Sequence, residues 1–149
     1  MIMFKPDCLE LASPFSFREI LGEVMRLGAG RAGNDNGWLL EFGVRARISR
    51  QMAERLYAAH QGKPFYDRLV RFTSDAPAFV SVWSFCGGPA WETGRSVVSQ
   101  IRQACGKSNP DVTGPANLIH GSGSFAEAAD EVRWATELLT QVVPAASSA

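Results

Sequence analysis

The 149-residue chain lacks the long apolar segments that mark membrane proteins and the leader that marks secreted ones. No stretch approaches the roughly 20 apolar residues of a membrane-spanning helix. Lys5-Pro6-Asp7 interrupts the apolar start too early for a secretory signal. We therefore expect a cytoplasmic protein with no membrane partner.

Cysteines are few, and they lack the spacing of a metal site. The chain contains three, with no C-x-x-C segment and only two histidines in the whole sequence. This argues against a structural zinc site. Cys8, Cys86 and Cys105 are therefore predicted to be free, buried thiols in a reducing compartment.

Net charge is also absent, since fifteen basic residues balance fifteen acidic ones. No global field favours nucleic acid or an anionic membrane, so neither is expected as a partner. A P-loop is missing as well, because neither Gly28-x-Gly30 nor Gly87-Gly88 precedes Gly-Lys-Ser/Thr, and both are predicted to be turns. Twelve of the basic residues are arginines, whose planar fork suits local phosphate contacts.

Strand and helix signals alternate along the chain and predict an α+β sandwich, with helices covering one face of a small antiparallel sheet. Capping boxes at Ser16–Glu19 and Ser124–Glu127 begin two of the helices, and Ser49 is predicted to cap another. The predicted strands cover 1–4, 38–48 and 78–83; the predicted helices cover 17–27, 50–57, 64–72, 93–104 and 125 to beyond 132.

Several local expectations accompany these elements. Residues 28–37 are predicted to be a flexible link, and Leu40, Phe42 and Val44 are expected to share one face of their strand. The length allows one hydrophobic core. We expect a single domain over residues 1–141 and a frayed tail over 142–149.

His120 is the most informative residue, because it lies between a short apolar stretch and a Gly/Ser turn, with a helix start close behind. A histidine held on both sides can act as a nucleophile. Next to Gly-Ser, however, a histidine is more often a turn residue whose ring is satisfied locally. A second signal supports the nucleophile: the opening strand delivers a lone lysine, Lys5, at its end.

These segments resemble the nucleoside diphosphate kinase family, whose chains open with an apolar strand and Lys-Pro-Asp. The family carries its active histidine in Asn-(Ile/Leu)-Ile-His-Gly-Ser, which matches residues 117–122. The resemblance runs in order from Met1 to about Leu139 and includes Tyr57, Lys63–Val70, Val82-Trp83, Thr93–Arg95 and Ser108–Pro110. It implies a ferredoxin-like βαββαβ fold.

The resemblance also implies a ping-pong transfer of the γ-phosphate from a nucleoside triphosphate to a nucleoside diphosphate through phospho-His120. Glu131 matches the glutamate that supports the histidine; the alternative is a surface carboxylate. Lys5 would supply positive charge to the phosphate, and Tyr57 would pack beside the histidine and lysine. Mg²⁺ is expected to arrive with the nucleotide rather than in a protein cage.

The remaining matches concern nucleotide binding. By resemblance Arg95 and Ser108 contact phosphate, Asn117 contacts the sugar, and Phe65 and Leu69 form the slot for the base. Without the motif around them, Phe65 and Leu69 would be interpreted as plain core. Stacking and sugar contacts distinguish bases poorly, so broad nucleotide acceptance is expected.

Departures from the family lie around the expected pocket. Residues 111–116 replace a longer loop that carries a phosphate-binding arginine in the family, and Gly123 stands where an aspartate is usual. Arg102 or Lys107 could occupy the vacant place, although a solvated helix surface is the expected position of each. The family uses the missing loop to assemble hexamers, so a homodimer is favoured over a hexamer.

Three functions therefore remain open from the sequence. The first is a working nucleoside diphosphate kinase. The second is an enzyme on the same scaffold that acts on a specialised nucleotide in a biosynthetic pathway. The third is a nucleotide-binding protein with little kinase activity, which the retained nucleophile and its supporting carboxylate argue against. Fold alone cannot separate them, because one scaffold hosts several functions.

Overall fold

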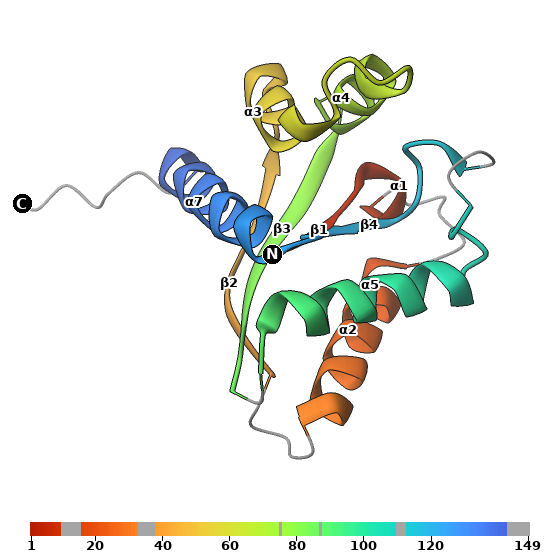
Figure 1. The fold of residues 1–149 in the computed structure, drawn as a ribbon, viewed down its shortest axis with the longest axis vertical. Helices are drawn as coiled ribbons and strands as arrows, with labels where there is room; N and C mark the ends of the chain where they lie inside the picture. Colours follow the sequence, from red (N-terminus) through yellow and green to blue (C-terminus); the bar gives the residue numbers. More distant parts are fainter. Residues whose placement is uncertain (10–15, 33–37, 75, 87, 110–112, 143–149) are drawn as a thin grey trace, which may run out of the picture.

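The computed structural model describes most of the chain and shows a four-stranded antiparallel sheet with helices packed on it (Figure 1). The sheet has the strand order β2-β3-β1-β4. Its strands are β1 (Ile2–Phe4), β2 (Trp38–Arg47), β3 (Pro77–Phe85) and β4 (Ile119–Gly121). The described residues are 1–9, 16–32, 38–74, 76–86, 88–109 and 113–142.

Helices connect these strands in the order that a ferredoxin-like fold requires. They are α1 (Pro6–Leu9), α2 (Phe17–Ala32), α3 (Arg50–Leu56), a 3₁₀ turn η1 (Ala58–His60), α4 (Tyr66–Ser74), α5 (Ala90–Ala104) and α7 (Phe125–Val142). The series β1-α2-β2-β3-α5-β4 is the expected βαββαβ core, with α3 and α4 inserted between β2 and β3. The predicted fold class is confirmed. None of the described helices is long and apolar enough to cross a membrane.

Local capping signals begin the helices where the sequence predicts. Ser16 Oγ accepts a hydrogen bond from the Glu19 amide, and Glu19 Oε2 accepts one from the Ser16 amide. Ser49 Oγ accepts a bond from the Met52 amide at the start of α3. Each contact satisfies an amide that the first helical turn leaves without a partner.

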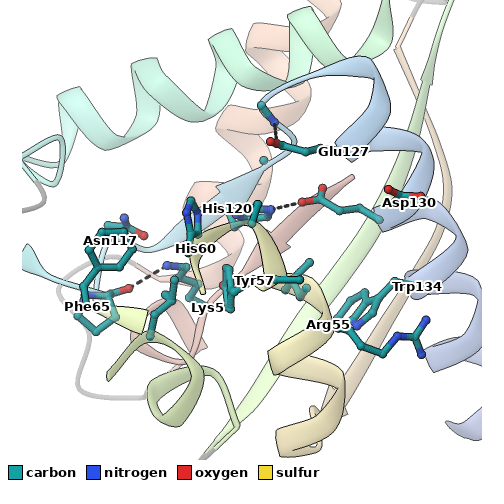
Figure 2. Close-up of a pocket in the computed structure, with 18 of the residues that line it drawn as sticks. Lys5, Arg55, Tyr57, His60, Phe65, Asn117, His120, Glu127, Asp130 and Trp134 are labelled. Atoms are coloured by element: carbon teal, nitrogen blue, oxygen red, sulfur yellow. Dashed lines mark hydrogen bonds and ion pairs between the residues drawn. The ribbon is translucent and has the colours of Figure 1, made fainter. Parts of the chain in front are cut away.

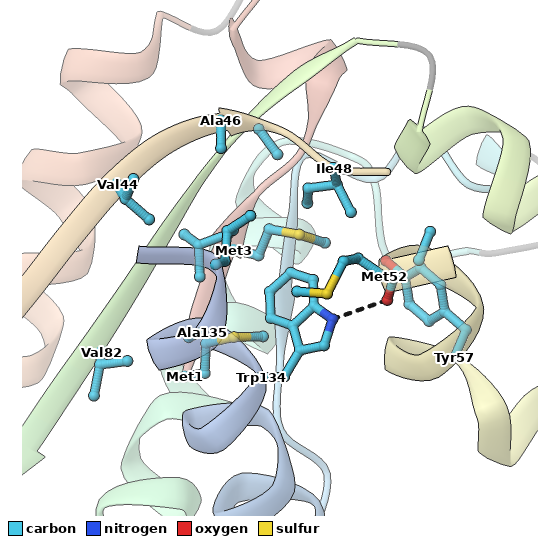
Figure 3. Close-up of a cluster of buried hydrophobic side chains, with 14 of the residues drawn as sticks. Met1, Met3, Val44, Ala46, Ile48, Met52, Tyr57, Val82, Trp134 and Ala135 are labelled. Carbon is cyan, nitrogen blue, oxygen red and sulfur yellow. Dashed lines mark hydrogen bonds between the residues drawn. The ribbon is translucent and has the colours of Figure 1, made fainter. Parts of the chain in front are cut away.

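Helices cover both faces of the sheet, whereas the sequence predicted one covered face. In β1 and the residue before it, Met1 and Met3 join one hydrophobic cluster, and Ile2 and Phe4 join the other. The first cluster lies under α3, α4 and α7, where Trp134 Nε1 donates to the Met52 carbonyl at 2.8 Å (Figure 3). The second lies under α2 and α5. A central strand buried on both faces needs a continuous apolar run, which residues 1–4 provide.

Two local predictions were wrong. Helix α2 continues through Gly28 to Ala32, where a flexible link was expected; the rest of that link, 33–37, lies outside the described residues. A Cβ on Gly28 would lie 2.3 Å from Trp38 Cδ1, so this glycine permits a close helix–strand contact. Leu40 is 46% exposed, because a register shift between Leu40 and Phe42 reverses the alternation of the strand.

The end of the chain is described only in part. Helix α7 extends to Val142, whereas the sequence predicted a helix that reaches at least Val132. The remainder of the predicted tail, 143–149, lies outside the described residues.

Candidate functional site

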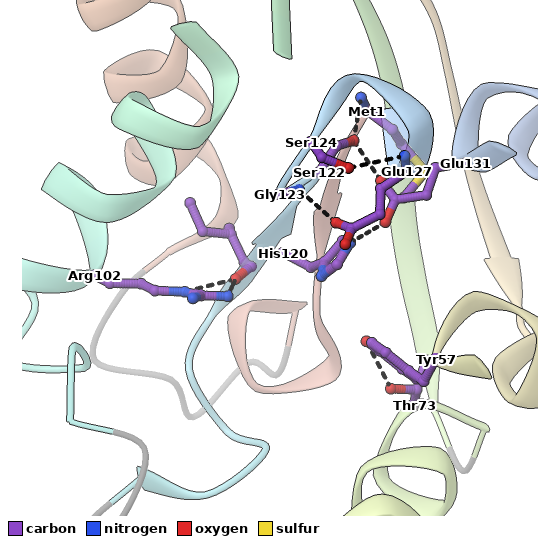
Figure 4. Close-up of polar contacts among 11 residues, drawn as sticks. Met1, Tyr57, Thr73, Arg102, His120, Ser122, Gly123, Ser124, Glu127 and Glu131 are labelled. Atoms are coloured by element: carbon purple, nitrogen blue, oxygen red, sulfur yellow. Dashed lines mark hydrogen bonds and ion pairs between the residues drawn. The ribbon is translucent and has the colours of Figure 1, made fainter. Parts of the chain in front are cut away.

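His120 lies on the edge strand β4, where it pairs with Met3 of the central strand β1. Its Nε2 atom is 2.7 Å from Glu131 Oε1 on α7 (Figure 4). The two side chains are 17% and 8% exposed. Strand β4 therefore fixes the imidazole, and helix α7 fixes its carboxylate partner.

The second carboxylate oxygen of Glu131 is also engaged. Ser122 Oγ donates a hydrogen bond to Oε2, and Ser122 accepts one from the Met1 nitrogen at 3.2 Å. Burial raises the pKa of Glu131, but hydrogen bonds from His120 and Ser122 outweigh burial and hold that pKa below its usual value. The carboxylate is therefore ionised and can accept an N–H from His120 Nε2; in the imidazole tautomer that donates this bond, the lone pair lies on Nδ1.

Tyr57 packs against this imidazole from the end of α3. The two ring centroids are 5.8 Å apart and the planes meet at 89°, an edge-on contact. Thr73 donates a hydrogen bond to the Tyr57 hydroxyl at 3.4 Å. Burial raises the pKa of Tyr57, so the phenol stays neutral beside His120.

Lys5 follows β1 and is only 3% exposed. Its Nζ donates to the Pro115 carbonyl at 2.9 Å. Burial and, to a smaller extent, the charge of Arg102 lower the pKa of Lys5 to about 7, although Asp7 opposes the change. An ammonium held with so little water is stabilised when an anion, such as a phosphate, binds beside it.

A strained residue connects the lysine to the histidine strand. Leu118 has a φ of 69°, which is uncommon for a residue other than glycine. Its amide donates to Asp7 Oδ2 at 2.9 Å, and its carbonyl accepts a bond from the Lys5 amide at 2.7 Å. Strained backbone persists where neighbours over-determine it, and here those contacts fix Lys5 relative to β4.

A pocket of about 970 Å³ opens in front of these groups (Figure 2). Its size lies at the upper end of the range for small-molecule sites. The structure brings together seven of the nine predicted site residues in its lining: Lys5, Tyr57, Phe65, Leu69, Asn117, His120 and Glu131. Asn117 Oδ1 is buried without a hydrogen-bond partner in the described part of the chain, so a ligand hydroxyl could engage it.

Arg95 and Ser108, although described, are not among the lining residues. Arg95 is exposed and donates to the Gly123 carbonyl at 3.0 Å; Ser108 is exposed beyond the end of α5. Arg102 is half-buried in the pocket instead, and its Nε donates to the Ile119 carbonyl at 3.0 Å. The expectation of a solvated Arg102 was wrong. Its position one turn after the buried Val98 was the available signal, since it lies at the edge of the apolar face.

Other pocket residues were missed because the family resemblance assigned them no role. His60 is exposed, as expected, but its ring contacts Phe65 at 5.5 Å and Tyr57 at 6.3 Å between centroids. Arg68 of α4 also lines the pocket. The available signal was spacing. His60 follows Tyr57 by three residues and Arg68 follows Phe65 by three, which places the members of each pair on the same side of a helical turn.

The turn from β4 into α7 differs from a simple capping box. Ser124 Oγ accepts the Glu127 amide as predicted, at 3.2 Å. Glu127 Oε2 accepts the Gly123 amide, at 2.7 Å, rather than that of Ser124. A Cβ on Gly123 would lie 2.8 Å from the same oxygen, so the glycine leaves room for this carboxylate.

The cysteines are free, as predicted, but only Cys8 is fully buried, while Cys86 is exposed and Cys105 is intermediate. Burial raises the pKa of Cys8 to about 12, so that thiol is inert. No group of three His, Cys, Asp or Glu side chains able to hold a metal ion occurs within the described ranges.

Comparisons with known proteins point to one family. The nucleoside diphosphate kinase family profile matches residues 1–137. A Staphylococcus epidermidis nucleoside diphosphate kinase is 30% identical, over 91% of this chain and 85% of its own. A structure from the same family in Babesia bovis superposes with a TM-score of 0.65 at 24% identity, covering 89% and 84%. A Halobacterium salinarum nucleoside diphosphate kinase in complex with CDP gives 0.55 at 28% identity, covering 90% and 82%.

Proposed function

The chain belongs to the nucleoside diphosphate kinase family, and from this premise we propose that it moves the γ-phosphate of a nucleoside triphosphate to a nucleoside diphosphate through phospho-His120. The observation that carries the mechanism is the 2.7 Å contact between His120 Nε2 and Glu131. It fixes the tautomer whose Nδ1 can attack phosphorus. Glu131 also stabilises the positive charge that the ring gains as it attacks.

The two half-reactions balance without an external base. The Nδ1 lone pair forms a bond to the γ-phosphorus while the bond from phosphorus to the β–γ bridging oxygen breaks. The nucleoside diphosphate leaves with that electron pair. A second diphosphate then attacks the phosphohistidine with its terminal oxygen and regenerates the neutral ring. Phosphoryl transfer of this kind depends chiefly on positioning and on charge around the transferring oxygens.

Lys5 and Arg102 supply that charge in our proposal. Both line the pocket with His120, and both are held by carbonyls of the segment that leads to it, Pro115 and Ile119. Arg102 thus takes the place of the arginine missing from the shortened loop. The roles of Arg95 and Ser108 stay predictions of the family resemblance.

The nucleoside is proposed to lie along the wall opposite the phosphates. Phe65, 42% exposed, offers a ring for the base, and Leu69 lies beside it in the pocket. The unpartnered Asn117 Oδ1 would accept a bond from a sugar hydroxyl. The relative whose structure is a complex with CDP supports a nucleotide as the ligand. Mg²⁺ would enter as part of the nucleotide substrate, coordinated by phosphate and water.

We also propose a cytoplasmic homodimer with one domain over residues 1–141 in each subunit. The free, buried Cys8 is compatible with a reducing compartment. Strand β2 is an edge of the sheet within the described residues, and Leu39 and Leu40 are exposed on it. An exposed apolar edge strand is a template for pairing with a second copy.

The test is labelling of the purified protein with ATP that carries a labelled γ-phosphate, followed by a chase with several nucleoside diphosphates. We expect acid-labile label on the wild type and on His60→Ala, none on His120→Ala, and prompt passage of the label to every diphosphate. A folded, nucleotide-binding protein that takes up no label would overturn the mechanism. Passage to one unusual diphosphate alone would favour the specialised enzyme.

A further inference from the structure

Arg68 is a charged residue of the pocket that the transfer of phosphate does not use. It lies on α4, three residues after Phe65, which directly precedes the helix, and both residues line the pocket. The proposed base platform therefore has a guanidinium beside its ring.

Contact with the opposite wall fixes where that guanidinium lies. A Cβ on Gly114 would be 3.1 Å from Arg68 Nη2 and 3.2 Å from its Cζ. Gly114 has a φ of +56°, a conformation that favours glycine, so the loop presents a bare Cα to the arginine. Arg68 thus spans from α4, the helix that Phe65 directly precedes, to the loop residue next to Pro115.

The other arginines of the pocket are already engaged. Arg55 pairs with Glu137, Arg133 pairs with Asp130, and Arg102 donates to a backbone carbonyl. No ion pair or hydrogen bond in the described ranges includes Arg68. Its N–H donors are consequently available to a ligand that occupies the slot over Phe65.

We propose that Arg68 hydrogen-bonds the edge of the base and gives the site a preference for guanine nucleotides. Guanine offers two adjacent acceptors, O6 and N7, which match the arginine fork. Adenine presents an amino donor beside N7, cytosine presents an amino donor, and uracil offers a single carbonyl there. Stacking on Phe65 would still admit every base, so the preference is graded. This inference rests on the proposed function, because it places the base over Phe65 and the phosphates at His120.

The experiment measures how fast GDP, ADP, CDP and UDP each discharge the phosphoenzyme under single-turnover conditions. For the wild type we expect the second-order rate constant for discharge by GDP to exceed that for ADP by about 10-fold, which is the lower end of the discrimination that a bidentate contact provides. Arg68→Ala should reduce this ratio to about 1, mainly through a loss with GDP. Arg68→Lys keeps the charge without the fork, and it should also lose most of the ratio.

Arg71→Ala is the matched control, since Arg71 is exposed on the same helix three residues on and is not among the lining residues. It should keep the wild-type ratio. A wild-type ratio within about twofold of 1 overturns base recognition. So does an Arg68→Ala variant whose rate constants fall by the same factor with all four diphosphates, and that result would indicate a phosphate contact.

Failure of the proposed function is seen separately, as a wild type that never takes up label. The preference is then tested by equilibrium binding of fluorescent GDP and ADP analogues to the wild type and Arg68→Ala. Tighter binding of the guanine analogue that disappears in Arg68→Ala supports the inference. Equal binding of both analogues by the wild type overturns it.

Discussion

The two ends of the pocket differ in how firmly the protein holds their side chains. At the reactive end, each group is mostly buried and contacts a neighbour: Lys5, Tyr57, His120 and Glu131. At the base end, Phe65, His60 and Arg68 are all exposed. Phosphoryl transfer loses rate steeply with misplacement, whereas a stacked base tolerates adjustment. In the proposed site, the reactive groups are therefore built into the core, and Phe65 and Arg68, the groups proposed to bind the base, lie on the surface.

After the nucleophile His120 itself, the largest effect at the reactive end is expected from Lys5→Met. Removing one preorganised charge donor typically costs about 10²–10³-fold in kcat. Steady-state transfer from ATP to a diphosphate measures this loss. Lys63→Met, at an exposed position outside the pocket lining, is the control and should keep kcat within about twofold. A small loss in Lys5→Met would place the phosphate away from Lys5.

The same substitution should raise the stability of the free protein, in a pH-dependent way. The pKa of Lys5 is about 7 in the folded chain and 10.5 ordinarily. Between these values the unfolded chain holds a proton that the folded chain has released, so the wild-type free energy of unfolding rises with pH across that window. Lys5→Met lacks this rise. Its stability advantage is largest below pH 7 and shrinks toward pH 10.5, as urea unfolding would show; parallel curves would refute the buried-ammonium account.

A second comparison ranks the two arginines of α5. Arg102→Ala is expected to lower kcat by about 10²-fold, because it removes a half-buried guanidinium from the reactive end. Arg95→Ala should lower it by about threefold at most, through the lost bond to the Gly123 carbonyl. Steady-state kinetics of both variants decide between the structure and the family resemblance. The reverse ranking would return the phosphate role to Arg95.

These arginines also show what the sequence could and could not predict. The family resemblance identified Glu131 as the partner of His120. Capping residues marked the helix starts at Ser16 and Ser49, because a capping signal is local. Arg102 was named as a candidate for the vacant place but was expected on the solvated surface, because helical periodicity defines an apolar face but not the carbonyl that a residue at its edge will meet. That partner, Ile119, is 17 residues away.

Errors in the fold have the same origin. A one-residue irregularity in β2 moved Leu40 to the exposed side, and no composition signal marks where a strand takes an extra residue. Gly28 was interpreted as the start of a flexible link, yet it is the point where α2 packs on Trp38. A glycine needed for close approach and a glycine needed for a turn look identical until the neighbouring element is placed.

Among the groups of the reactive end, the smallest expected effect concerns the support behind the nucleophile. Ser122→Ala removes the donor to Glu131 Oε2, and we expect a roughly 10-fold fall in kcat, with KM unchanged because Ser122 touches no proposed nucleotide contact. Ser124→Ala, two residues on, removes a helix cap and should cost about 1 kcal/mol of stability with kcat unchanged. If kcat falls in both variants, and only in proportion to their lost stability, then Ser122 holds the turn and not the carboxylate. A fall confined to Ser122→Ala shows that the rigidity of the reactive end extends one contact beyond Glu131.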